Sequence, residues 1–156
     1  MTETLADALE REHREIDGGL EAFADSRGTG EPDSAALAQA VTGLRRHIYL
    51  EEEMFFPPLR AAGLMGPVLV MLREHGEMWR LLDELEAEQA RDPAGAAAAR
   101  LLEDLMPRLE AHNLKEERIL YPQADAVLEG EPGEELRQFM ASGRMPPGWV
   151  CEMARA

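Results

Sequence analysis

Histidine and glutamate recur at fixed spacings in two stretches of this chain. Residues 47–57 and 112–122 both read His-x3-Glu-Glu-x3-aromatic-Pro, and their histidines lie 65 positions apart. Residues 11–16 and 73–78 share a second pattern, Arg-Glu-His-x-Glu followed by an apolar residue, with 62 positions between the histidines. All four histidines of the chain belong to these patterns. The sequence is therefore an internal duplication that carries every histidine in it.

The spacing of each histidine and glutamate suits metal binding. Residues i and i+4 share one face of a helix, so His47 points the same way as Glu51, and His112 the same way as Glu116. Imidazole nitrogen with carboxylate oxygen suits iron, manganese or zinc, and helical bundles build such sites from inward side chains. One histidine on an apolar face is more often an ordinary core residue, but four at equivalent positions favour a metal site. The predicted ligands are His13, His47, Glu51, His75, His112 and Glu116.

Other acidic residues lie beside these ligands. Successive helical residues are about 100° apart, so Glu51, Glu52 and Glu53 cannot all face inward. We expect Glu52 and Glu53 to lie in solvent. Asp17 lies one turn after His13, and it is either a hydrogen-bond acceptor for that imidazole or a surface carboxylate.

Three glycines and two tyrosines lie in or near the patterns. Gly18, Gly19 and Gly76 each cost roughly 1 kcal/mol relative to alanine within a helix. They mark loose packing, a close approach of helices, or room for a small ligand. Tyr121 is expected in the core, and either Tyr121 or Tyr49 is a candidate relay for an electron or a proton on residue type alone.

Length and composition indicate one domain. A chain of 156 residues can bury roughly two-thirds of its unfolded surface. Its single cysteine, Cys151, cannot close an internal disulfide. The 31 acidic and 16 basic residues give a formal charge of −15, which argues against nucleic acid as a partner. The N-terminus lacks a signal-peptide pattern and no apolar run could span a bilayer, so we expect a soluble, cytoplasmic protein with no membrane partner.

Apolar periodicity predicts helices throughout and no strand. Prolines 57 and 122 are expected to end the second and fourth helices, and Pro107 to kink the fourth. Leu105, Leu109 and Ile119 should line the inner face of the fourth helix. The four expected helices span residues 4–26, 34–56, 67–90 and 93–121.

This pattern predicts an all-α fold. Short connections between long helices favour an up-down-up-down four-helix bundle, which we assign to residues 1–128. Residues 129–156 lie outside the repeat and form an appended C-terminal segment. It comprises a short helix over residues 134–142 and a tail rich in proline and glycine, in which Trp149 and Cys151 have no assigned role.

Over residues 4–128 the chain resembles the hemerythrin-like proteins of the HHE cation-binding family. The resemblance rests on His13, His75 and the two His-x3-Glu-Glu-x3-aromatic-Pro patterns. It implies a non-haem di-iron centre inside the bundle, with an oxo or hydroxo bridge. Glu51 and Glu116 would bridge the two irons and the histidines would be terminal ligands. Zinc or manganese could substitute for iron.

The chain departs from the oxygen-carrying hemerythrins. Those proteins have five histidines, two of them four residues apart on one helix, whereas the neighbours of His75 at that spacing are Met71 and Trp79. Their last carboxylate is an aspartate five residues after its histidine, whereas Glu116 follows His112 by four. The arrangement is instead similar to hemerythrin-like proteins linked to iron-centre repair under nitrosative stress, iron sensing and peroxide removal.

With two histidines and two shared carboxylates for each iron, both irons would keep an open position. The resemblance therefore implies a protein that reacts with dioxygen, peroxide or nitric oxide in oxidative or nitrosative stress defence. Alternatives are a reversible oxygen-binding or oxygen- or iron-sensing protein, and an iron storage or donation protein. Enzymatic activity, of peroxidase, catalase-like or oxidase type, stays open, as does the oligomeric state.

Overall fold

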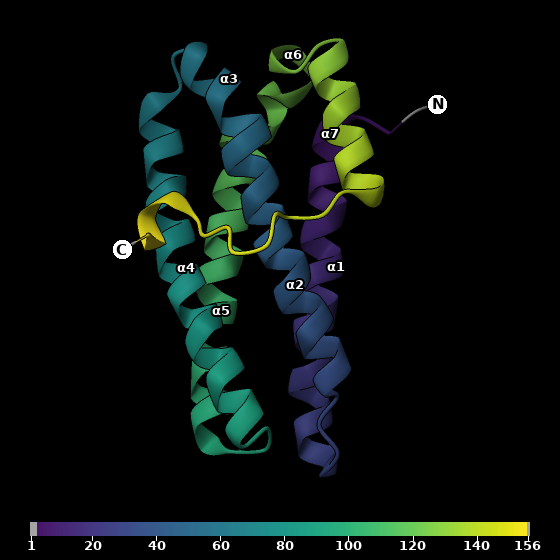
Figure 1. Ribbon diagram of the computed structural model, residues 1–156, viewed down its shortest axis with the longest axis vertical. Coiled ribbons are helices and arrows are strands. Elements are labelled where there is room, and N and C mark those ends of the chain that lie inside the picture. The colour runs from purple at the N-terminus through teal and green to yellow at the C-terminus, as the bar shows by residue number, and fades with distance from the viewer. Residues whose placement is uncertain (1–2, 156) are drawn as a thin grey trace.

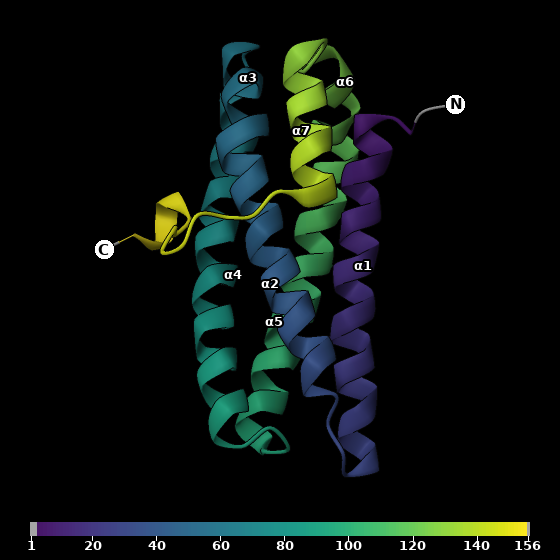
Figure 2. The ribbon, with the colours of Figure 1, turned by 45° about the vertical axis from the view of Figure 1, so that its right-hand side comes forward.

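The computed structural model describes residues 3–155, and these residues form helices and no strand. Four helices of 17 to 27 residues run alternately down and up along one axis (Figures 1 and 2), which confirms the predicted up-down-up-down bundle. None of the described helices combines the length and apolar character needed to cross a membrane. The four helices are α1 (Leu5–Ser26), α2 (Ser34–Leu50), α4 (Met65–Arg91) and α5 (Ala96–Lys115).

The first two helices begin where the sequence predicts. The Thr4 side chain accepts a hydrogen bond from the Asp7 amide, and the Asp33 side chain accepts one from the Ala36 amide. Both bonds satisfy amides that have no partner within the helix. The short turn η1 (Arg27–Thr29) joins the two helices. One face of α1 is apolar and buried, and it consists of Leu5, Leu9, Ile16, Leu20 and Phe23.

The second and fourth helices do not end at Pro57 and Pro122, so that prediction was wrong. After α2 comes a π-helical turn, η2 (Glu51–Phe55), and then α3 (Phe56–Ala61). After α5 come a π-helical turn and two shorter helical segments. These are η3 (Glu116–Leu120), η4 (Tyr121–Gln123) and α6 (Ala124–Val127).

The π turns explain how both helices pass a proline. In each turn an amide bonds to the carbonyl five residues earlier, Phe56 to Glu51 and Tyr121 to Glu116. Each following proline then lies in the first turn of the next helical segment. A missing N–H costs nothing there, because first-turn amides have no partner within the segment.

The π turns also change which side chains face the core. A π turn adds one residue to the turn and so rotates the following positions by about 100°. Ile119, which we expected on the inner face, is 47% exposed, whereas Tyr121 is fully buried. The expectation for Ile119 was wrong because it assumed an unbroken α-helical phase.

The helix α5 also begins later than expected. Residues Asp92 to Gly95 form a turn in which the Gly95 amide bonds to the Asp92 carbonyl at 3.0 Å, so the helix starts at Ala96 and not at Pro93. Pro107 lies inside α5, which continues to Lys115.

The predicted ligand histidines lie at the boundary between two apolar clusters. One cluster includes Phe23 and Leu82, and the other includes Leu9 and Leu72. His13 falls between Leu9 and Ile16, which belong to different clusters, and the other three histidines fall at equivalent places. The bundle therefore carries one polar layer between two apolar layers.

The C-terminal residues return along the bundle. The helix α7 (Glu131–Ser142) starts three residues earlier than expected, and Leu136 on it packs in the same cluster as Leu5. The chain then crosses in front of the bundle and ends at the short turn η5 (Glu152–Ala154) against α4, as Figure 1 shows in yellow.

Two adjacent glycines give a matched test of helix packing. An added Cβ at Gly19 would lie 2.9 Å from the Ala40 Cβ and 3.2 Å from the Ala36 carbonyl oxygen, whereas one at Gly18 would meet nothing within 4 Å. Gly18→Ala should therefore stabilise the protein by roughly 0.5–1 kcal/mol through helix propensity. Gly19→Ala should destabilise it by roughly 1–2 kcal/mol, because α1 and α2 must separate. Urea unfolding checks both values, and equal effects would contradict the assigned close approach.

Candidate metal centre

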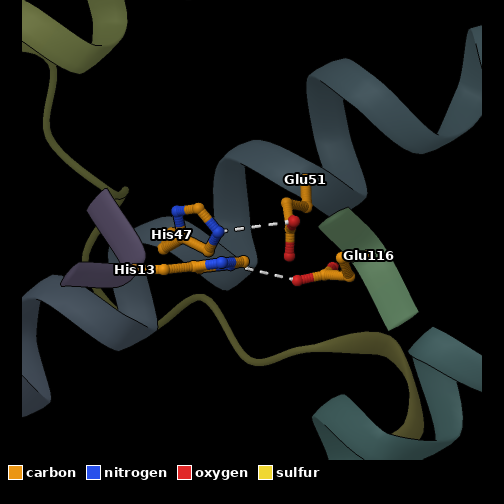
Figure 3. Close-up of side chains that lie close together, drawn as sticks. All are labelled: His13, His47, Glu51 and Glu116. Carbon is orange, nitrogen blue, oxygen red and sulfur yellow. Dashed lines mark ion pairs between the residues drawn. The ribbon is translucent and has the colours of Figure 1, made fainter. Parts of the chain in front are cut away.

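The six predicted ligand residues come together in the middle of the bundle. One group is His13, His47, Glu51 and Glu116, drawn in Figure 3, where the two imidazoles face the two carboxylates. The second group is His75 and His112 with the same two glutamates. Within each group the candidate ligand atoms lie within 4.8 Å of one another, and every residue is buried. Four helices therefore present four imidazoles around two shared carboxylates.

The Nε2 atom of every histidine faces one of the two central carboxylates. Glu51 meets both groups with different oxygens. Its Oε2 lies 3.4 Å from the Nε2 of His47, and its Oε1 lies 3.1 Å from the Nε2 of His75. The Oε1 atom of Glu116 lies 3.2 Å from the Nε2 atoms of both His13 and His112. A carboxylate with oxygens directed at two nitrogen sets has the geometry of a bridging ligand.

The π turns place the two central carboxylates. Glu51 opens η2 and Glu116 opens η3, so each carboxylate projects from the point where its helix widens. The Glu51 amide still bonds to the His47 carbonyl, so the i and i+4 relation that the sequence predicts is kept up to this residue. Single π turns occur often at functional sites. Here each π turn directs its first residue, Glu51 or Glu116, at the centre. The aromatic residue that follows the turn, Phe56 or Tyr121, is buried.

A second carboxylate lies against the outer nitrogen of every imidazole. A carboxylate oxygen accepts hydrogen bonds, so the imidazole Nδ1 donates and the Nε2 is left for the centre. This fixes the orientation of each ring. The four Nδ1 contacts are His13 with Glu117 at 2.8 Å, His47 with Glu12 at 2.8 Å, His75 with Glu52 at 2.7 Å, and His112 with Glu74 at 2.8 Å.

These outer carboxylates decide one open alternative and correct one expectation. Glu117, and not Asp17, is the partner of His13. Glu52 does not lie in solvent, because its side chain is only 5% exposed and holds His75, whereas Glu53 is exposed as expected. The signal was in the sequence: the outer glutamates repeat with the same spacings of 62 and 65 as the histidines.

The Tyr121 hydroxyl lies inside the first group of ligands. It donates to the Glu51 Oε2 at 2.7 Å and lies 2.8 Å from the Nε2 of His13 and 2.9 Å from the Nε2 of His47. The equivalent residue 65 positions earlier is Phe56, whose ring stacks on His75. The duplicated centre is therefore asymmetric, with a hydroxyl in one half only.

The residues fit a bound cation. Glu51 and Glu116 are fully buried, and burial of a carboxylate is costly unless the charge is compensated. The Oε2 atom of Glu116 is buried and has no hydrogen-bond partner among the described residues. A metal ion bound between the imidazole Nε2 atoms and these carboxylates would compensate both buried charges and give the Glu116 Oε2 atom a partner.

Without metal, the centre is a network of charged pairs. Burial alone would raise the pKa of Glu51, but the positive charge of His47 and hydrogen bonds hold it well below its usual range. Burial alone would lower the pKa of His112, but attraction to Glu116 and the bond to Glu74 raise it to about 10. The imidazole of His112 therefore carries a proton at neutral pH until a metal ion displaces it.

The fold and the site define a metal-binding helical bundle. The sequence model of the hemerythrin HHE cation-binding domain matches residues 4–124, and the chain belongs to this family. Comparison with curated proteins and comparison with solved structures each gave no match.

The raised pKa of His112 predicts how the metal-free protein responds to pH. A folded-state pKa of about 10 against an ordinary value of 6.5 adds stability that is complete below pH 6.5 and is lost as the pH rises to 10. We expect the free energy of unfolding to fall by roughly 2 kcal/mol or more over this range. Urea unfolding of metal-free protein from pH 6 to 10 measures it. His112→Gln should flatten the profile, and a flat wild-type profile would contradict the charged network.

Proposed function

We propose that this protein holds a non-haem di-iron centre that reacts with dioxygen, peroxide or nitric oxide in oxidative or nitrosative stress defence. The observation that carries the proposal is the pair of buried ligand groups that share Glu51 and Glu116. The proposed ligands are the four histidines and these two glutamates. Nitrogen and oxygen ligands in this ratio suit iron, with zinc and manganese as possible substitutes.

The sharing of carboxylates supports a centre with two metal ions. Each group contributes two imidazoles of its own, and both glutamates belong to both groups. A single ion bound in one group would be coordinated by the two imidazoles of that group only, and the other two imidazoles would have no metal. Two ions bridged by the carboxylates would use every ligand atom and compensate both buried charges.

The chain prepares the site in three ways. The outer carboxylates hold each imidazole with its Nε2 directed inward. The buried rings of Phe56 and Tyr121 limit the access of water. The four imidazoles and two carboxylates leave coordination positions open for a small ligand. A pair of irons, when bound, supplies electrons and those open positions to dioxygen, peroxide or nitric oxide.

The Tyr121 hydroxyl adds a proton source on one side of the centre. In the metal-free protein, burial, followed by the charges of Glu116 and Glu51, raises the pKa of Tyr121 well above its usual range, so there the hydroxyl keeps its proton at neutral pH. It lies within 2.9 Å of the Nε2 atoms of His13 and His47. The hydroxyl is therefore in reach of a ligand bound at that half of the centre, and it can donate a hydrogen bond or a proton to it.

Metal content tests the centre itself. Wild-type protein reconstituted with ferrous iron should retain two irons per chain. Glu51→Gln removes the charge of a bridging ligand and should leave at most one iron, whereas Glu110→Gln, on the exposed face two residues before His112, should retain both. Iron and protein are quantified after desalting. One iron or none in the wild-type protein would overturn the di-iron proposal.

Reaction of the reduced, iron-loaded protein tests the function. Tyr121→Phe should keep both irons but react with peroxide at least about tenfold more slowly, because the proton donor is lost. Tyr49→Phe is the matched control, since the Tyr49 ring packs on Phe139 and Trp149 and not on the ligands, and its rate should be unchanged. Stopped-flow absorbance measures the rates.

The same experiment separates the alternative functions. An oxygen adduct of the reduced protein that disappears under vacuum would favour reversible oxygen binding over redox chemistry. Two irons that react with none of dioxygen, peroxide and nitric oxide would overturn the proposed reactivity and favour iron storage or donation.

A further inference from the structure

The end of the chain lies against the metal centre. We use the name C-terminal strap for residues 148–154, which lie beside α4 (Figure 2). The Trp149 indole donates to the Glu53 Oε1 at 3.1 Å, and Arg80 on α4 donates to the Met153 carbonyl at 2.6 Å. The strap is thus attached both to the helix that carries His75 and to the turn that carries Glu51.

One hydrogen bond connects the strap to a predicted ligand through a single side chain. The Glu152 backbone amide donates to the Glu52 Oε1 at 2.9 Å. The other oxygen of Glu52 lies 2.7 Å from the Nδ1 of His75. Glu52 therefore holds His75 with one oxygen while the strap holds Glu52 by the other.

The duplication supplies an internal comparison. Glu117 is equivalent to Glu52 and lies 2.8 Å from the Nδ1 of His13. No strap covers it, and its side chain is 33% exposed, against 5% for Glu52. Glu52 and Glu117 thus occupy equivalent positions of the repeat, but only Glu52 receives a hydrogen bond from the strap. The reason is that the strap lies outside the repeat and covers only Glu52.

A glycine on α4 allows the close approach of the strap to this helix. A Cβ at Gly76 would lie 2.8 Å from the Met153 Cβ and 3.1 Å from the Met153 carbonyl, so only glycine at position 76 allows the strap this close to α4. Cys151 is fully buried, and burial followed by the charge of Glu52 raises the pKa of its thiol to about 12. This thiol serves packing, since only the thiolate is reactive.

The strap also borders a cleft that is lined by two side chains in contact with His75. Glu52 and Phe56 line this cleft, and both contact His75. Glu152 of the strap and the following Arg155 also line this cleft.

From these contacts we infer that Glu52 and the Glu152 amide are positioning groups for the His75–His112 metal position, and that the strap slows metal loss from this position alone. The inference rests on the proposed di-iron centre. A fixed Glu52 holds the imidazole of His75 with its Nε2 directed at the metal position, and it keeps the ligand from rotating away when the metal bond breaks. The partners of metal-bound histidines commonly change metal affinity by about 10- to 100-fold.

A proline substitution removes this hydrogen bond specifically. Glu152→Pro deletes the amide proton and puts a methylene group toward Glu52. Proline suits the local backbone, because Cys151 is extended, with φ −62° and ψ 152°, and residue 152 opens the helical turn η5. Glu152→Ala is the matched control, since it keeps the amide and loses only the side chain, which lies 3.7 Å from Arg60.

Iron release to an excess of chelator is the measurement, made on the iron-loaded full chain. In Glu152→Pro one of the two irons should leave about tenfold faster than in the wild-type protein, while the other leaves at the wild-type rate. Glu152→Ala should match the wild-type protein in both. Gly76→Ala should reproduce the effect of the proline, because its Cβ displaces Met153 by a separate route. Melting of the metal-free variants confirms that each one folds.

Two outcomes would overturn the inference while the di-iron proposal stands. One is equal release from Glu152→Pro and Glu152→Ala, and the other is equal acceleration of both irons, which would reflect a general loss of stability. A wild-type protein that retains fewer than two irons overturns the proposed function, and this inference with it, before any variant is compared.

Discussion

The burial of Glu51 and Glu116 is the constraint on which the rest of the structure depends. Both carboxylates are fully buried at the boundary between two apolar clusters. A buried charge that loses its partner costs several kcal/mol, so such a layer persists only when every charge is compensated. Here four imidazoles surround the two carboxylates, and four outer carboxylates hold the imidazoles in turn. The bundle is therefore organised around a polar layer that a metal ion completes.

The π turns reconcile this polar layer with the apolar layer above it. An uninterrupted α-helix from His112 would turn Ile119 inward. It would also place Pro122 inside the helix, where the backbone N–H that proline lacks would be needed for a hydrogen bond. The π turn lets Glu116 point at the centre, then buries Tyr121 and leaves Ile119 in solvent. The same device occurs after His47, which shows that the duplication repeated a backbone geometry together with its ligands.

The duplicated halves became different through residues around the ligands. Tyr121 brings a hydroxyl to one half where Phe56 brings only a ring to the other. The C-terminal residues act on the same centre from outside the repeat. The strap covers Glu52, while Arg46, which lies 3.8 Å from Glu12, donates to the Phe139 carbonyl on α7. The inner ligands thus follow the repeat, and the asymmetry comes from its surroundings.

The sequence by itself determined the helical class, the starts of the first helices, the six inward residues and the family. All of these depend on relations within one helix, such as the i and i+4 spacing or a side chain that caps its own first turn. Only the tertiary structure decided the partner of each imidazole, the burial of Glu52, the place of the Tyr121 hydroxyl and the site of the strap. These depend on how separate helices approach and on a π turn that moves every later residue by one position, and neither is encoded in local periodicity.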